Sequence, residues 1–179
     1  MKKLYYYIPF ICFCFLLVFF LKQLFEEQSP SELPSVLLNK KLPLIELEKL
    51  EGYSFMPYEN LFSNDKPFLI NVWSSWCGPC KIEHENLMKL RNTYKVPIFG
   101  INYKDEIENA KNFIENYGNP FSIIGVDRKG KEVINLGVYG IPETFIIDQS
   151  GYIKYRHVGP ILEYDMLNVI LPILKNLEE

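Results

Sequence analysis

The chain has 179 residues, of which 48% are hydrophobic and 15% aromatic, enough for one domain with a sizeable core and a short appendage. Its formal net charge of -3 provides no electrostatic basis for binding nucleic acid. Four cysteines are too few for a disulfide scaffold, and two of them, Cys12 and Cys14, lie in an apolar segment. Cys77 and Cys80 therefore form the one cysteine pair in the rest of the chain.

The appendage is the uncharged segment 4–21, which is long enough to span a bilayer. Lys2 and Lys3 precede it, and Glu26 and Glu27 follow it, so we expect a cytoplasmic N-terminus and export of the rest. No small-residue cleavage site follows at the usual distance, which favours a retained anchor over a cleaved signal peptide. The predicted organisation is a cytoplasmic N-terminus (1–3), a transmembrane signal-anchor (4–21), a linker (22–35) and an exported domain (36–179).

The exported domain shows strand and helix patterns that alternate along the chain. In order, we predict an edge strand at 42–47, a short helix at 58–62, a buried central strand at 68–73, a helix from about 79, a strand at 95–102, a helix at 104–117, a strand at 121–126, a short helix at 132–136, a hairpin of 144–148 and 152–157, and a closing helix at 161–177. Pro172 is expected to kink or shorten the last of these. This order predicts an α/β fold with a mixed sheet flanked by helices.

Cys77 and Cys80 stand where the apolar strand gives way to the following helix. A Cys-x-x-Cys pair in that position is typical of a dithiol redox site. The free N–H groups and the positive end of the helix dipole favour a thiolate at Cys77, and only the thiolate attacks a disulfide. Pro79 suits the first helical turn, where its missing N–H costs nothing. The sequence thus predicts thiol–disulfide exchange, with Cys77 as nucleophile, Cys80 as resolving thiol, and no metal or organic cofactor.

Pro142 follows Gly140 and Ile141 and leads directly into the strand predicted at 144–148. A trans turn would also fit this sequence, but in a dithiol protein of this layout we predict a cis Ile141–Pro142 bond that faces Cys77. Proline removes an N–H group from the edge of the site and exposes the backbone groups of the preceding residue. An extended substrate segment can pair with those groups and so present its sulfur to Cys77.

Trp76-Cys77-Gly78-Pro79-Cys80 resembles the thioredoxin signature, and Ile141-Pro142 resembles its cis-proline loop. Longer stretches are similar to the membrane-anchored thioredoxin-like proteins of cytochrome c maturation, the CcmG/DsbE type. These stretches are Asn71-Val72-Trp73, Glu83-His84, Gly100-Ile101-Asn102-Tyr103-Lys104-Asp105 and Gly137-Val138-Tyr139-Gly140-Ile141-Pro142-Glu143-Thr144-Phe145. The likeness covers about residues 39–159, and the anchor matches as well.

The resemblance implies a thioredoxin-like fold and a reductant that faces the periplasm from a single-pass anchor in the inner membrane. Its implied partners are apocytochrome c, or a maturation protein that carries the apocytochrome cysteines, and a membrane electron donor of the CcdA/DsbD type. Two other functions remain open: a general exported reductase or oxidant, and a copper-binding metallochaperone that uses Cys77, Cys80 and His84. His84 is itself expected to be an exposed helix residue.

Asn71 occupies the position at which thioredoxins usually have a buried Asp that helps to deprotonate the second cysteine. Since Asn cannot accept a proton, another group has to do so. Glu83 follows Cys80 by one helical turn on the same face, and Glu143 follows Pro142; both match acidic positions of the resembled family. We predict that one or both carboxylates relay the Cys80 proton and that they lie near the same pocket. The alternative for Glu83 is a solvated helix charge.

Trp76, Tyr139 and Ile141 are predicted to contact the substrate beside the dithiol. Trp73 is expected to pack in the core instead. Residues 103–105 either border the active-site groove, as the resemblance implies, or form a solvated loop.

Overall fold

The computed structural model describes residues 7–25, 37–62 and 66–178. The chain divides into two compact units, Met1–Glu32 and Leu33–Glu179. The described part of the first unit is a helix, α1 (Ile8–Phe25), on which many large apolar side chains are exposed. No helix among the described residues is both long enough and apolar enough to cross a membrane. The predicted anchor 4–21 begins outside these residues, and most of the predicted linker 22–35 lies outside them.

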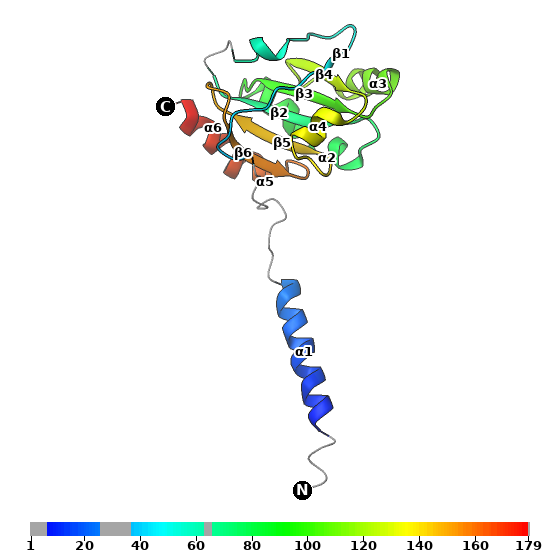
Figure 1. The fold of residues 1–179 in the computed structure, drawn as a ribbon, viewed down its shortest axis with the longest axis vertical. Helices are drawn as coiled ribbons and strands as arrows, with labels where there is room; N and C mark the ends of the chain where they lie inside the picture. Colours follow the sequence, from blue (N-terminus) through cyan, green and yellow to red (C-terminus); the bar gives the residue numbers. More distant parts are fainter. Residues whose placement is uncertain (1–6, 26–36, 63–65, 179) are drawn as a thin grey trace. The chain divides into compact units, whose positions relative to one another are not determined.

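In the described part of the second unit, six strands form one mixed sheet in the order β1-β4-β3-β2-β5-β6 (Figure 1). The strands are β1 (Glu48–Lys49), β2 (Phe68–Trp73), β3 (Ile98–Tyr103), β4 (Ile123–Asp127), β5 (Glu143–Ile147) and β6 (Ile153–Val158). Strands β2, β3 and β4 run parallel, while β1, β5 and β6 are each antiparallel to their neighbours. Every residue of β2 is buried, because this strand is central and covered on both faces. The predicted mixed sheet is confirmed.

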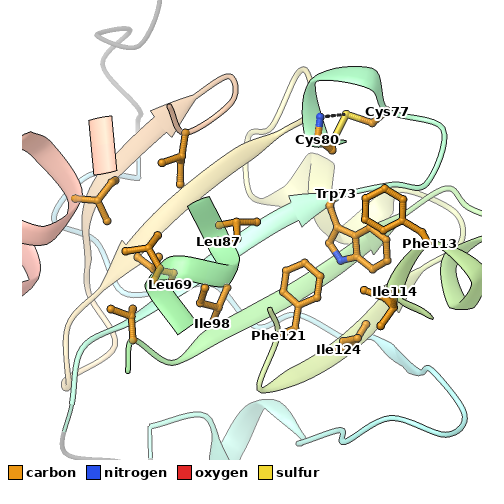
Figure 2. Packing of buried hydrophobic residues seen from close by; sticks show 14 of the residues in the cluster. Leu69, Trp73, Cys77, Cys80, Leu87, Ile98, Phe113, Ile114, Phe121 and Ile124 are labelled. Atoms are coloured by element: carbon orange, nitrogen blue, oxygen red, sulfur yellow. Dashed lines mark hydrogen bonds between the residues drawn. A yellow bond between two sulfur atoms is a disulfide. The ribbon is translucent and has the colours of Figure 1, made fainter. Parts of the chain in front are cut away.

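Helices cover both faces of this sheet and enclose two apolar cores. They are η3 (Tyr58–Asn60), α2 (Gly78–Asn92), α3 (Ile107–Tyr117), α4 (Lys131–Asn135), α5 (Glu163–Asp165), η4 (Met166–Ile170) and α6 (Leu171–Glu178). The first core joins α2, α3 and the C-terminal helices to one face, and Trp73 stacks there on Phe121 and packs at a tilt against Phe113 (Figure 2). The second core joins α4 and residues 42–61 to the other face. Cys77 and Cys80 lie in the first core.

The N-terminal edge strand begins later in the sequence than predicted. Residues 42–47 are not a strand, and β1, at Glu48–Lys49, pairs antiparallel with β4 instead. Pro43 has no N–H to give to a ladder, whereas the side chains of Leu42 and Ile45 are buried in the second core. The apolar pattern of 42–47 therefore reflects burial without strand pairing.

The closing helix is continuous in helical conformation from Glu163 to Glu178, but its middle is a π-helix, η4. Pro172 is the second residue after this wider turn. Because proline cannot donate the i→i−4 hydrogen bond and its ring crowds the preceding turn, a widened turn before it allows the helix to continue. The predicted helix is thus present, and Pro172 alters its winding rather than ending it.

Candidate active site

The dithiol stands at the start of α2, directly after the central strand. Cys77 is the N-cap of this helix, and the backbone N–H of Cys80 donates a hydrogen bond to Cys77 Sγ at 3.1 Å (Figure 2). The two cysteines form a disulfide, and their Cα atoms are 5.3 Å apart. Cys77 is only 3% exposed, so an attacking or attacked sulfur has to approach it from a narrow direction. In the reduced protein the same N–H group can stabilise a thiolate on Cys77.

A second loop completes the environment of Cys77. The Ile141–Pro142 peptide bond is cis, as predicted, and the carbonyl oxygen of Ile141 lies 3.7 Å from Cys77 Sγ. The carbonyl of Pro142 accepts a hydrogen bond from the N–H of Gly159 at 3.0 Å. The loop before β5 is therefore tied to the residue after β6, and it brings the Ile141 carbonyl to the sulfur.

Glu83, three residues after Cys80 in α2, is fully buried and is not a solvated helix charge. Its Oε1 accepts a hydrogen bond from Asn71 Nδ2 at 2.8 Å, and its Oε2 accepts one from the N–H of Ile161 at 3.0 Å. Burial raises the pKa of this carboxyl to about 8, and the bonds from Ile161 and Asn71 oppose that rise. A carboxyl with a pKa close to neutral can both accept and return a proton.

Glu143 lies on the other face of the sheet. Along β5 it shares a face with Phe145, which belongs to the second core, whereas its neighbour Thr144 faces Asn71. The Oε2 of Glu143 accepts a hydrogen bond from Arg156 Nε at 2.6 Å in a buried ion pair. The expectation that Glu143 shares a pocket with Glu83 is therefore wrong, because Glu143 projects toward the second core, whereas Glu83 in α2 bonds Asn71 on the opposite face of the sheet.

The aromatic residues predicted to meet the substrate are exposed. Trp76 is 59% exposed, and its indole Nε1 donates a hydrogen bond to the carbonyl of Lys104 at 3.0 Å. Tyr139 is 63% exposed, and Ile141 is half-buried between the two cores. Trp73, by contrast, is buried in the first core, as expected.

Two open grooves flank Trp76, with volumes of about 390 and 460 Å³. The larger is lined by Trp76, Lys104, Asp105, Glu106, Asn109 and Arg128. Lys104 and Asp105 thus border a groove beside Trp76, the residue before Cys77, whereas Tyr103 of the predicted 103–105 does not line it.

Asp105 is a structural anchor of the dithiol loop that the sequence did not reveal. Its Oδ1 accepts a hydrogen bond from Ser75 Oγ at 2.7 Å, and its Oδ2 accepts bonds from the N–H of Ser75 at 2.7 Å and from Asn102 Nδ2 at 3.0 Å. Together with the bond between Trp76 and Lys104, these contacts tie the residues before Cys77 to the loop after β3. The only sequence signal for Asp105 was its position in the stretch 100–105, which resembles the cytochrome c maturation proteins.

Replacing Asp105 with asparagine is expected to lower the free energy of unfolding by about 2 kcal/mol. In either orientation the amide NH₂ would face donors that the carboxylate now accepts from: the Ser75 N–H and Asn102 Nδ2 at the Oδ2 position, or the Ser75 hydroxyl and the Glu106 N–H at the Oδ1 position. Urea unfolding of the oxidised protein measures this change. Glu106→Gln, at the exposed neighbouring position, is the matched control, and equal stability of the two variants would contradict the anchoring role.

His84 is buried, with 5% exposure, so the prediction of an exposed residue is wrong. Its Nε2 lies 3.0 Å from the carbonyl oxygen of Gly118, and its ring packs edge-on against Phe113. Burial lowers the pKa of the ring, and hydrogen bonds with Gly118 and Tyr117 oppose this. Within residues 7–25, 37–62 and 66–178, no group of three or more His, Cys, Asp or Glu side chains is placed to hold a metal ion. His84 instead links α2 to the end of α3.

Comparisons with known proteins agree with this geometry. The Redoxin family matches residues 38–170. The thiol:disulfide interchange protein DsbE of Pasteurella multocida is 40% identical over 181 residues, which cover 99% of this chain and 98% of the relative. The chain belongs to the DsbE family. A second member, DsbE of Escherichia coli K12, is 37% identical over 90% of this chain and 88% of its own length. As a DsbE-family protein with a Cys77–Cys80 disulfide, the chain is a thiol:disulfide oxidoreductase.

Solved structures confirm the thioredoxin-like fold expected for a DsbE-family protein. A DsbE-type protein from Chlorobium tepidum superimposes with a TM-score of 0.66 at 24% identity, over 78% of this chain and 97% of that protein. A secreted thiol-disulfide isomerase from Corynebacterium glutamicum gives a TM-score of 0.63 at 20% identity, over 84% and 98% of the two chains.

Proposed function

We propose that this oxidoreductase is a reductant of the periplasm, and that it reduces the cysteines of apocytochrome c or of a maturation partner that carries them. The observation that carries the proposal is the dithiol geometry: Cys77 caps α2, accepts the N–H of Cys80, and faces the Ile141 carbonyl, with the buried acid Glu83 one turn behind. The sequence resemblance to proteins of cytochrome c maturation supports the choice of substrate.

Reduction proceeds through one mixed disulfide. The Cys77 thiolate attacks a partner sulfur, a Cys77–partner disulfide forms, and the other partner sulfur leaves as a thiolate that takes up a proton. The Cys80 thiol then loses its proton and attacks Cys77 Sγ, which breaks the mixed disulfide and releases the second partner thiol. Two electrons pass to the partner, and the Cys77–Cys80 disulfide remains, as in this structure.

In this scheme Glu83 accepts the proton of Cys80 during the second step. Both side chains are buried, and Glu83 follows Cys80 by three positions in α2. With a pKa of about 8 in the oxidised protein, Glu83 is mainly protonated at neutral pH, which is the state expected after it has received that proton. Pro142 and Ile141 present the partner segment, and Trp76 and Tyr139 provide the exposed contact area beside Cys77.

The proposal includes a membrane anchor at 4–21, which would hold the domain near a membrane electron donor of the CcdA/DsbD type and raise their effective concentration. The flanking charges, Lys2 and Lys3 before the segment and Glu26 and Glu27 after it, support a cytoplasmic N-terminus, and the exposed apolar side chains of α1 support the anchor itself. Alkaline carbonate extraction tests it: an anchored chain stays with the membrane pellet, whereas release into the supernatant would contradict the anchor.

A trapping experiment tests the substrate. Full-length Cys80→Ala expressed in the native membrane cannot resolve the mixed disulfide, so partners should accumulate covalently bound to Cys77. The matched control is the Cys77→Ala/Cys80→Ala double variant, which should capture nothing. Recovery of apocytochrome c, or of a maturation protein with its own cysteine pair, would support the proposal.

Capture of many unrelated exported proteins would overturn the specific role in favour of a general exchange enzyme. A reduction potential separates the two directions of exchange: a value close to about -270 mV fits a reductant, and one close to about -120 mV fits an oxidant.

A further inference from the structure

A buried ion pair lies on the face of the sheet opposite to α2. Arg156 in β6 donates from Nε to Glu143 Oε2 at 2.6 Å, and their side chains are 7% and 0% exposed. Removing two charges from water is costly, so such a pair persists only where the remaining donors and acceptors also find partners. The guanidinium also lies over the ring of Phe145, 5.8 Å from its centroid, and the other side-chain contacts of the two residues described below go to one loop.

That loop is 137–141, which leads into the cis-proline. Arg156 Nη2 donates a hydrogen bond to the carbonyl of Gly137 at 3.0 Å, and the guanidinium lies over the ring of Tyr139, 5.1 Å from its centroid. The free oxygen of Glu143, Oε1, accepts a bond from the N–H of Tyr139 at 3.4 Å. Both charged side chains therefore form hydrogen bonds with the backbone of this loop, and Arg156 also packs on the Tyr139 ring.

The held loop is the one that meets the reacting sulfur. Ile141 is two residues after Tyr139, and its carbonyl oxygen lies 3.7 Å from Cys77 Sγ. The Tyr139 ring rests on the guanidinium and is still 63% exposed, so it offers a supported surface beside the disulfide.

We infer that Glu143 and Arg156 are positioning residues, which hold the Tyr139 ring and the Ile141 carbonyl in place to receive the extended partner segment next to its disulfide. This role rests on the proposed function, and it differs from the proton relay predicted for Glu143 from the sequence. The pair acts on binding of the partner and leaves the electron and proton transfers of the dithiol to Cys77, Cys80 and Glu83.

Arg156→Lys tests this role, because lysine retains the charge but lacks the planar fork that reaches Glu143 and Gly137 together and stacks on Tyr139. The assay follows reduction of a synthetic peptide that contains a disulfide-closed Cys-x-x-Cys-His sequence by catalytic full-length protein, with an added small dithiol that returns the protein to its reduced form after each turnover and with the rate in the absence of protein subtracted. The KM is expected to rise about tenfold with kcat unchanged within about twofold, and the reduction potential and pH profile should stay as in the wild type.

Lys154→Arg is the matched control. Lys154 lies in the same strand and forms an ion pair with Asp148, away from the loop, so its substitution should leave the KM unchanged.

A double-mutant cycle with Tyr139→Leu makes the test specific to the loop. Tyr139→Leu alone should raise the KM to a similar extent, and adding Arg156→Lys should then have little further effect, since both changes remove one surface. Glu143→Gln provides the same comparison if Arg156→Lys folds poorly. A wild-type KM in a folded variant would overturn the inference, and so would a lower kcat with a shifted pH profile.

The peptide assay measures how the loop binds an extended segment that carries a disulfide, whichever protein supplies that segment in the cell. It therefore remains informative if the trapping experiment identifies a substrate other than apocytochrome c. A failure of the cytochrome c proposal and a failure of the positioning role are therefore distinguishable.

Discussion

Glu83→Gln is expected to remove a large part of the pH dependence of stability between about pH 4.5 and 8. Glu83 has an ordinary pKa of 4.5 in the unfolded chain and about 8 in the folded, oxidised protein. Between these values folding takes up a proton, so the contribution of Glu83 to stability is fully present below pH 4.5 and is lost as the pH rises toward 8. The slope for one such group is about 1.4 kcal/mol per pH unit, and glutamine has no proton to take up.

Urea unfolding at a series of pH values, followed by the fluorescence of Trp73 and Trp76, measures this slope. The matched control is Glu85→Gln, which removes a carboxylate from the same helix at a position where the side chain is 80% exposed. A Glu83→Gln profile parallel to that of the wild type would mean that Glu83 is ionised in the folded protein.

The same substitution is expected to slow the release of a partner from the Cys77 mixed disulfide by about 100-fold near pH 7, the scale of general acid–base catalysis. Glutamine keeps the shape of the side chain and can still accept a hydrogen bond, but it cannot take the Cys80 proton. Stopped-flow measurement of the resolving step checks this, with Glu85→Gln again as the control. An unchanged rate would exclude Glu83 as the proton acceptor.

Trp73→Ala should lower the free energy of unfolding by about 3–5 kcal/mol, the range for removing a large aromatic side chain from a core. Trp73 is buried between Phe113 and Phe121, with ring centroids 5.3 and 5.2 Å away, and it fills the space between the central strand and α3 (Figure 2). Glycine at position 100 allows this packing, because a Cβ there would come within 2.9 Å of the indole nitrogen of Trp73.

Trp76→Ala is the matched control for that loss, since it removes the same side chain at an exposed position. Its cost should be less than about 1 kcal/mol, from one surface hydrogen bond to Lys104 and little buried area. Urea unfolding at one pH compares the two. Similar losses for both variants would show that the Trp73 cluster contributes little to the stability of the domain.

The sequence by itself determined the parts of the site that depend on local chemistry. Two cysteines after an apolar strand and before a helix predicted the dithiol, and Gly140-Ile141-Pro142 before a strand predicted the cis bond; both are present. Central burial of 68–73 and the hairpin around Gly151 were also readable, because uninterrupted apolar residues and turn residues act over a few positions.

Tertiary structure decided the environments of the charged residues, because their partners come from distant parts of the chain. Glu83 accepts a hydrogen bond from the N–H of Ile161, which is 78 positions away, and the packing around it decides between the buried acid and the solvated charge that the sequence left open. Glu143 meets Arg156 of β6, 13 positions away, on the opposite face of the sheet, and the end of α3 covers His84. Spacing along a helix or strand specifies which face a side chain occupies, but only the packed fold determines whether that face meets water, an opposite charge or a carbonyl.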